Sequence, residues 1–165
     1  MNKLTNKLEI ETADAQSGVN LEKFLDVTAE YFRENWPQNL KGHKDWRAHY
    51  TQWLKTRSKD GRRRLWIIKI GGKVAGLANF YSSGPEHERV GHVAEFYVRP
   101  DFRRRGVGQD IFSIIREELV KDECRIIKSE VQPDEPGRMN FWENLGFKVE
   151  KVQMALDLTD DGEEE

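Results

Sequence analysis

The sequence is poor in the features that assign a chain to a class at a glance. One cysteine, Cys124, occurs in 165 residues, so no intramolecular disulfide can form, as is usual in a reducing compartment. No stretch approaches the roughly 20 apolar residues of a membrane span, and the first residues lack the apolar core of a signal peptide. No Cys, His or Asp spacing is typical of a metal site. We therefore expect a cytoplasmic protein with neither a membrane partner nor a metal.

An excess of positive charge is also missing. The chain has 27 Lys and Arg against 29 Asp and Glu, and its formal net charge is −2. Such a balance gives no general attraction for nucleic acid, and no nucleic-acid-binding motif accompanies the short basic clusters Arg62–Arg64 and Arg103–Arg105. A nucleic-acid partner is not expected, and any anion site must come from a local cluster.

Hydrophobic periodicity predicts one α/β domain over residues 1–158, followed by an acidic tail at 159–165. The expected order is strand, two helices, three strands, helix, strand, helix, strand. The ranges are 8–12, 20–35, 43–57, 64–70, 74–81, 92–98, a helix after 108, 125–131, 136–144 and 147–156. Gly71-Gly72 favours an antiparallel hairpin and a helix between strands favours a parallel pair, so we expect a mixed sheet with helices on both faces. Asn20 should cap the first helix, and Gly146 should end the last.

Aromatic residues are plentiful, and several fall in the first half of the chain: Trp36, Trp46, Tyr50, Trp53 and Tyr81. Trp46, Tyr50 and Trp53 share one face of the helix expected at 43–57. Core packing is the simpler interpretation of this stripe. The alternative is the wall of an acceptor pocket, because aromatic faces attract cations. Both interpretations can hold for different residues.

The segment Arg103-Arg-Arg-Gly-Val-Gly108 falls between an expected strand and an expected helix. A helix start leaves backbone N–H groups unpaired, and with the helix dipole they attract anions. Gly106 and Gly108 have no Cβ, so a phosphate can approach the backbone closely. The arginines add charge and paired donors. This composition favours a diphosphate ligand over the alternative of a solvated basic loop, and it fits neither a P-loop nor a dinucleotide fingerprint.

Two motifs make the prediction of a diphosphate ligand more specific. Arg103-x-x-Gly106-x-Gly108 resembles the pyrophosphate-binding motif of the GNAT superfamily of acyl-CoA-dependent N-acetyltransferases. Downstream, Asn140-Phe-Trp-Glu-Asn-Leu-Gly-Phe147 is similar to that family's aromatic-rich helix ending in Gly-Phe. With the order of elements, the resemblance covers roughly residues 7–158. It implies a single-domain GNAT-like fold whose mixed, mostly antiparallel sheet is splayed at strands 4 and 5, where strands ending at Val98 and Val131 leave a gap.

The resemblance also implies acetyl-CoA as cosubstrate and a set of residues that contact it. These are Phe96, Val98, Arg103, Arg104, Arg105, Gly106, Val107, Gly108, Gln109, Asn140 and Trp142. Trp142 is a departure, since many family members place a tyrosine there as the general acid. Indole N–H donates hydrogen bonds but does not ionise usefully, so Tyr97, Tyr81 or water must protonate the leaving thiolate.

Transfer to an amine also needs a base. Glu95 is the preferred candidate, because it interrupts an apolar strand three residues before Val98 and partial burial would raise its pKa. The alternative is an exposed or ion-paired carboxylate. His92 is the second candidate, because neutral imidazole suits proton abstraction, although a polar residue near a strand start is the simpler interpretation.

These residues predict an N-acetyltransferase that moves the acetyl group of acetyl-CoA directly to a primary amine of a small molecule or protein. The alternative is a non-catalytic acyl-CoA-binding sensor or regulatory module, which the departure at Trp142 keeps open. The pattern leaves the acceptor open, and it allows either a monomer or a homodimer.

Overall fold

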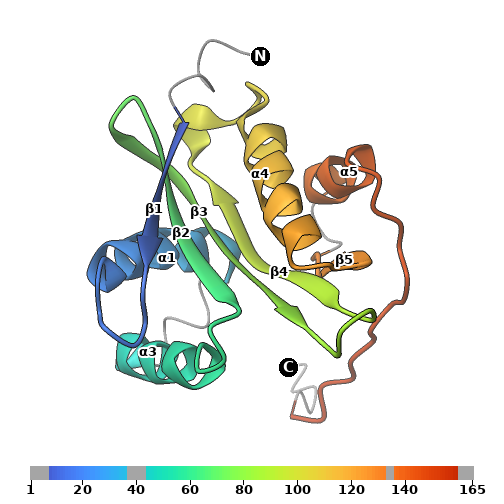
Figure 1. Cartoon of the computed structure of the whole chain (residues 1–165), viewed down its shortest axis with the longest axis horizontal. Coiled ribbons are helices and arrows are strands. Elements are labelled where there is room, and N and C mark those ends of the chain that lie inside the picture. The colour runs from blue at the N-terminus through green and yellow to red at the C-terminus, as the bar shows by residue number, and fades with distance from the viewer. Residues whose placement is uncertain (1–7, 37–43, 133–135, 160–165) are drawn as a thin grey trace, which may run out of the picture. The chain divides into compact units, whose positions relative to one another are not determined.

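The computed structural model describes residues 8–36, 44–132 and 136–159 (Figure 1). The chain divides into two compact units, residues 1–130 and 131–165. The single domain expected over 1–158 therefore remains a prediction. Residues 160–165 of the expected acidic tail lie outside the described residues. Among the described helices, none combines the length and the apolar character needed to cross a bilayer.

The first unit is built on a five-stranded sheet whose strands lie in sequence order. The first three neighbouring pairs are antiparallel, and the last pair is parallel. The strands are β1 (Leu8–Ala13), β2 (Arg63–Ile70), β3 (Lys73–Ser83), β4 (Val90–Val98) and β5 (Ile126–Ser129). Gly71 and Gly72 make the β2–β3 turn with positive φ angles of 59° and 80°, as the hairpin prediction requires. The expected mixed, mostly antiparallel sheet is confirmed.

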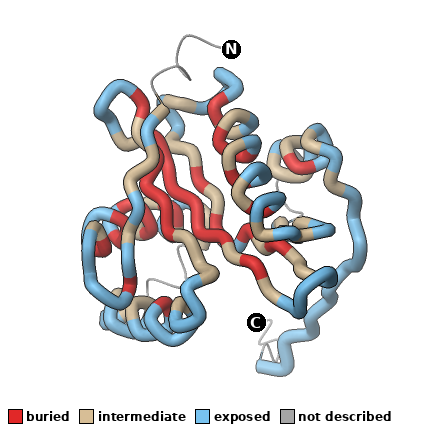
Figure 2. The backbone as a smooth tube through the Cα atoms, in the orientation of Figure 1, coloured by how far each residue is buried: buried red, intermediate tan, exposed pale blue. Residues whose placement is uncertain are grey.

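Helices cover both faces of this sheet (Figure 1). They are α1 (Leu21–Asn35), α3 (Trp46–Arg57) and α4 (Val107–Lys121). The first two helices share a core with alternate residues of β2, β3 and β4, which are Leu65, Ile67, Leu77 and Tyr97. The other face packs on α4, where Leu119 lies so close to Gly91 that a Cβ there would approach it to 2.8 Å. The strands between the helices form the buried centre of this unit (Figure 2).

The sheet opens between its last two strands. The parallel ladder joins Val90–Val93 to Ile126–Ser129, and β5 then ends, two residues short of the expected Val131. Because β4 continues to Val98, its residues 94–98 extend beyond the ladder. The expected splay at strands 4 and 5 is confirmed.

A bulge in β4 changes which residues share a face. Asn79 of β3 pairs with Glu95, but the next residue, Phe80, pairs with Val93, so β4 carries one extra residue. An extra residue shifts the alternation of side chains by one position. His92 and Glu95, an odd number of residues apart, therefore both face the α1 and α3 side.

The expected cap at Asn20 is wrong. This residue precedes α1 with a left-handed φ of 56° and makes no side-chain cap hydrogen bond. Its side-chain amide instead donates to the carbonyl of Thr12 at 2.9 Å. Asparagine tolerates the left-handed conformation better than most residues, and here its side chain links the start of α1 to β1.

The second unit contains α5 (Pro136–Asn144), and Gly146 ends it as predicted. Gly146 has φ 98°; its N–H reaches the carbonyl of Glu143 at 2.9 Å, and the N–H of Phe147 reaches that of Trp142 at 3.1 Å. This is the paired bonding of a Schellman motif.

The strand expected at 147–156 is wrong, because the described residues of this segment have no strand conformation. Its apolar side chains Val149, Val152, Met154 and Leu156 are 61–90% exposed. The sequence pattern was strand-like, but a strand exists only where a neighbouring strand bonds its backbone.

Candidate active site

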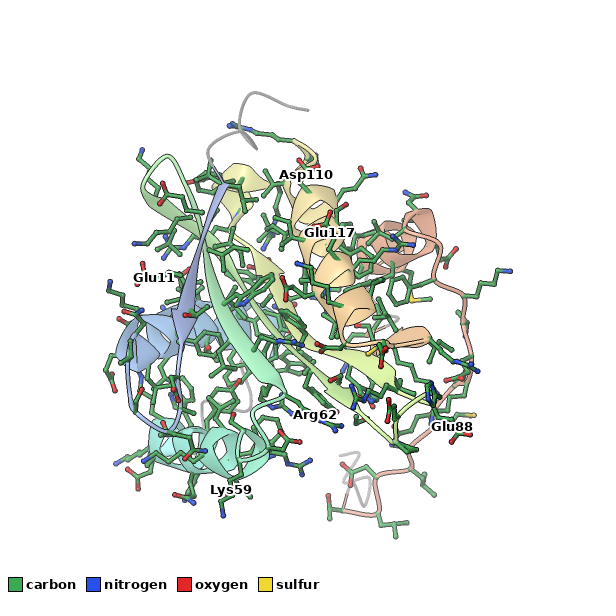
Figure 3. All side chains as sticks on the ribbon, in the orientation of Figure 1. Glu11, Lys59, Arg62, Glu88, Asp110 and Glu117 are labelled. Atoms are coloured by element: carbon green, nitrogen blue, oxygen red, sulfur yellow. The ribbon has the colours of Figure 1, made fainter. Side chains whose placement is uncertain are left out.

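The segment Arg103–Gly108 follows β4, and its last two residues, Val107 and Gly108, begin α4. Gly106 has φ 75° just before the helix, a conformation that favours glycine, and a Cβ there would meet nothing within 4 Å. The first helical bond runs from Asp110 N–H to the Gly106 carbonyl at 3.1 Å. Helix geometry therefore leaves the N–H groups of residues 107–109 at an open helix start. Asp110 and Glu117 lie along this helix in Figure 3.

This helix start suits an anion, and the three arginines that precede it differ in their contacts. Arg103 donates from Nε to the carbonyl of Val98 at 2.8 Å and from Nη2 to Glu34 at 2.7 Å. It therefore ties the loop to β4 and α1. Arg104 and Arg105 are exposed and add positive charge beside the helix start. Gln109 is exposed on the first turn. Backbone N–H groups, helix dipole and arginines together fit a pyrophosphate.

The part of β4 beyond the ladder contains two more of the residues expected to contact the cofactor. Phe96 and Val98 lie in the part of β4 beyond the ladder, and both are half-buried. Alternate N–H and C=O groups of such a strand point away from its one neighbour. A pantetheine arm carries amides that can bond such groups. Val107 is 1% exposed and packs inward, so it offers the site its backbone alone.

Asn140 and Trp142 belong to the second unit. Asn140 is exposed, whereas Trp142 is buried and packs edge-on against Phe141 and Phe147, with ring centroids 5.3 and 5.0 Å away. Its ring thus has a local packing role. Cofactor contacts from these two residues remain a prediction.

Glu95 is a buried acid, with 9% of its surface exposed. Its Oε1 accepts hydrogen bonds from Nδ2 of Asn79, at 2.7 Å, and from the hydroxyl of Tyr50 on α3. Its Oε2 is buried and has no hydrogen-bond partner. One carboxylate oxygen is therefore held in place by the protein, and the other is left to bond something else.

Burial raises the pKa of the Glu95 carboxyl, because it disfavours the charged form. The hydrogen bonds from Tyr50 and Asn79 and the charge of Arg63 oppose that rise. Burial, and then the nearby Glu95, also raise the pKa of Tyr50 well above its usual value. The phenol therefore keeps its proton and acts as the donor. A carboxylate with a raised pKa is a stronger base, which is what proton abstraction needs.

His92 shares the Glu95 face through the bulge. Its Nε2 lies 2.9 Å from the hydroxyl of Ser83, and its ring stacks on Tyr81 with centroids 4.6 Å apart. Burial, followed by the charges of Lys128 and Arg63, lowers the pKa of His92. The imidazole is therefore neutral at neutral pH.

Tyr97 lies on the same face but deeper, at 6% exposure in the core shared with α1. Its ring packs 5.6 Å from that of Tyr31 and also 5.6 Å from the guanidinium of Arg103. Burial, followed by the charges of Glu34 and Glu30, raises the pKa of Tyr97 to about 12. The hydroxyl keeps its proton over the physiological range.

The sequence did not reveal the network around Glu95. Arg63 donates from Nη1 to Oδ1 of Asn79 at 2.7 Å, and its guanidinium lies 5.0 Å from the ring of Trp53 and 4.2 Å from that of Tyr81. One signal was present, since Asn79 is a polar residue inside an otherwise apolar strand and is fully buried. The contacts of Arg63 had no sequence signal.

The aromatic residues of the first half form two groups that overlap at Tyr50. Trp36 packs on Tyr31 with ring centroids 5.1 Å apart, and Trp46 packs on Phe32 at 5.5 Å, so both extend the α1 core. Tyr50, Trp53 and Tyr81 contact the Glu95 and Arg63 network, and Tyr50 also packs on Phe32 with ring centroids 5.5 Å apart. Core packing therefore holds for Trp36 and Trp46. A role of Tyr50, Trp53 and Tyr81 in an acceptor pocket remains a prediction.

Solved structures share this fold. A predicted acetyltransferase from Clostridium acetobutylicum, solved with acetyl-CoA, superposes with a TM-score of 0.70 over 93% of this chain and 97% of its own, at 12% identity. At that identity the likeness establishes the fold alone.

Sequence relatives are acetyltransferases by name. An uncharacterized N-acetyltransferase of Methanocaldococcus jannaschii is 28% identical over 136 residues, which is 81% of this chain but only 58% of the relative's length. The glucosamine 6-phosphate N-acetyltransferase of Trypanosoma brucei brucei is 29% identical over 114 residues, covering 60% of this chain and 71% of that protein. The family profile described as "Acetyltransferase (GNAT) family" matches residues 21–147, well over half of the sequence. The chain therefore belongs to the GNAT family of acetyltransferases.

Proposed function

We propose that this chain transfers the acetyl group of acetyl-CoA directly to a primary amine. Family membership and the names of its relatives support acetyl transfer. The observation that carries the proposal is Glu95, a buried carboxylate on β4 with one oxygen held by two donors and the other without a partner. It lies on the strand whose residues 94–98 extend beyond the ladder with β5.

The residues of the first unit would hold acetyl-CoA at two places. The N–H groups of residues 107–109, with Arg104 and Arg105, would bind the pyrophosphate, and Arg103 would keep this loop in position. The backbone of residues 94–98 would pair with the pantetheine arm. Acetyl-CoA supplies an acyl thioester, whose C–S bond breaks as the new amide bond forms.

Glu95 supplies the proton transfer. A primary amine with a pKa near 10.4 is almost fully protonated at pH 7, and deprotonating it costs about 4–5 kcal/mol. Oε2 of Glu95 takes that proton, while Tyr50 and Asn79 hold Oε1 in place. His92, as neutral imidazole, is the second candidate for the base.

Protonation of the leaving thiolate needs little help, because a thiol pKa near 8.5 makes the thiolate a good leaving group near neutrality. Tyr97 is the proposed donor, since it keeps its proton and lies on the same strand as Glu95. Its burial in the α1 core means that water is the alternative source.

The test uses the intact chain. Calorimetry with acetyl-CoA measures binding, and release of free thiol over a panel of amines measures transfer. We expect wild-type transfer that Glu95→Gln loses while it still binds acetyl-CoA. Binding without transfer to any amine would instead support the sensor, and no binding at tens of micromolar would overturn the proposal.

A further inference from the structure

Two unsatisfied polar atoms of opposite character lie in the same network. Among the side-chain N and O atoms that the structure describes, four are buried without a hydrogen-bond partner, and two of these are Oε2 of Glu95 and Nε of Arg63. A buried polar group without a partner costs about 1–3 kcal/mol, so such atoms are uncommon unless water, an ion or a ligand satisfies them. One of these atoms accepts a hydrogen bond and the other donates one.

The side chain of Asn79 joins the two groups. Its Nδ2 donates to Oε1 of Glu95 and its Oδ1 accepts from Nη1 of Arg63, both at 2.7 Å. One planar amide therefore fixes the spacing between the carboxylate and the guanidinium. Because both of its functional groups are bonded, Asn79 leaves the second oxygen of Glu95 and the Nε of Arg63 to another partner.

Aromatic rings hold the guanidinium in a fixed orientation. Arg63 lies 5.0 Å from the ring of Trp53 and 4.2 Å from that of Tyr81. Trp53 also stacks on Tyr50, with ring centroids 5.8 Å apart and planes at 11°. Trp53 is the exposed ring of this set, at 39%, so it forms the solvent-facing side of the network.

Charge then restricts what can approach Glu95. An ammonium group is attracted by the carboxylate but repelled by Arg63, whose charge acts on both Glu95 and His92. For an amine with no other charged group, the attraction by Glu95 is offset by the repulsion from Arg63. An amine that also carries an anion gains both, because guanidinium pairs with carboxylate and phosphate.

We infer that the acceptor is an amine that also carries an anionic group, a carboxylate or a phosphate, with its nitrogen at Oε2 of Glu95 and its anion at Arg63. This inference rests on the proposed function. It makes Arg63 a specificity-determining residue of the acceptor site. The competing role is a purely structural brace between α3 and the sheet, which would give no preference for anionic amines.

The experiment compares amines that differ only in the anion. Phenylalanine is paired with phenethylamine for a carboxylate, and phosphoethanolamine with ethanolamine for a phosphate. Glucosamine 6-phosphate with glucosamine is a third pair. We expect kcat/KM of the wild type to be about 10-fold higher for the anionic member of at least one pair, equivalent to about 1.4 kcal/mol. The pairs that respond tell a carboxylate preference from a phosphate preference.

Three variants separate recognition from bracing. Arg63→Gln should abolish the preference, mainly through KM, and Arg63→Lys should restore part of it because the charge remains. Arg57→Gln is the matched control, since exposed Arg57 lies over the same Trp53 ring at 5.1 Å. A brace alone would change transfer to both members of each pair equally.

A measurement on the wild type does not depend on how the variants fold. Calorimetry in the presence of CoA should show that the anionic amines bind more tightly than their partners, and 3-phenylpropionate should compete with the acceptor. Equal binding of both members in all pairs, with normal transfer, overturns the inference and leaves the proposed function standing. Tighter binding of the anionic amines without any acetyl transfer would support the anion preference of the site but overturn the proposed function.

Discussion

The hydroxyl of Tyr50 on α3 donates a hydrogen bond to Glu95 on β4, 45 residues further along the chain. The contact fixes the carboxylate from the helix side, while Asn79 fixes it from the neighbouring strand at 2.7 Å. Both donors meet the same oxygen, so the second oxygen keeps a defined direction. A base held in this way loses little entropy when the acceptor amine arrives.

Glu95→Gln tests the base directly. The amide keeps a carbonyl oxygen for Tyr50 and Asn79 but cannot accept a proton at neutral pH. We expect kcat to fall by about 100- to 10,000-fold, the range of general-base catalysis, with acetyl-CoA affinity unchanged. Glu88→Gln, in the exposed loop between β3 and β4, is the control of equal charge (Figure 3). Transfer at wild-type rates in Glu95→Gln would assign the base to His92 or to water.

Tyr50→Phe should move the pH dependence of the reaction. The wild-type rate should rise with pH as Glu95 loses its proton, with a midpoint above the ordinary carboxyl pKa of 4.5 because burial raises it. The Tyr50 hydrogen bond stabilises the carboxylate and lowers that pKa, so its removal should raise the midpoint further. We expect kcat/KM at pH values near and below the wild-type midpoint to drop by up to about 10-fold and to recover at higher pH. An unchanged midpoint would show that the rise of the rate with pH reports the titration of another group.

The local geometry of the candidate site could be predicted from the sequence, although the roles of its residues stay predictions. The loop from Arg103 to Gly108 is defined by glycine positions between a strand and a helix, and Glu95 was conspicuous as an acid in an apolar strand. The partners of Glu95 could not be found in this way. Tyr50 and Arg63 reach it through side-chain contacts between elements distant in sequence, and no periodicity records such contacts.

The bulge in β4 and the segment 147–156 show the same limit in the backbone. Simple alternation places His92 and Glu95 on opposite faces, and only the pairing of Phe80 with Val93 reverses this. The alternating apolar residues of 147–156 predict a strand, yet pairing decides whether a strand forms. Periodicity describes what a segment can do, whereas register and pairing are properties of the folded chain.

Stability should also depend on pH through Glu95. Its pKa is higher in the folded chain than in the unfolded one, so the folded state binds more protons between the two values. The free energy of unfolding therefore falls as pH rises from about 4.5 through the folded pKa. Glu95→Gln should flatten that fall. The free energy of unfolding of the variant, compared with that of the wild type, should therefore be more favourable at pH 7 than at pH 4. Chemical denaturation at a series of pH values measures this, and parallel curves for the two proteins would contradict it.

Gly108→Glu tests the anion site without touching the acceptor network. The glycine lies in the first turn of α4, where a glutamate adds both a side chain and a negative charge beside the open N–H groups. Negative charge near a helix start does not weaken the helix, so the fold should survive. We expect acetyl-CoA affinity to fall by at least about 100-fold, because several charge-assisted hydrogen bonds to phosphate are lost. Ser113→Glu, on the exposed face of the same helix, adds equal charge further from the loop and should bind normally. Equal affinities in the two variants, measured by calorimetry on folded protein, would place the cofactor elsewhere.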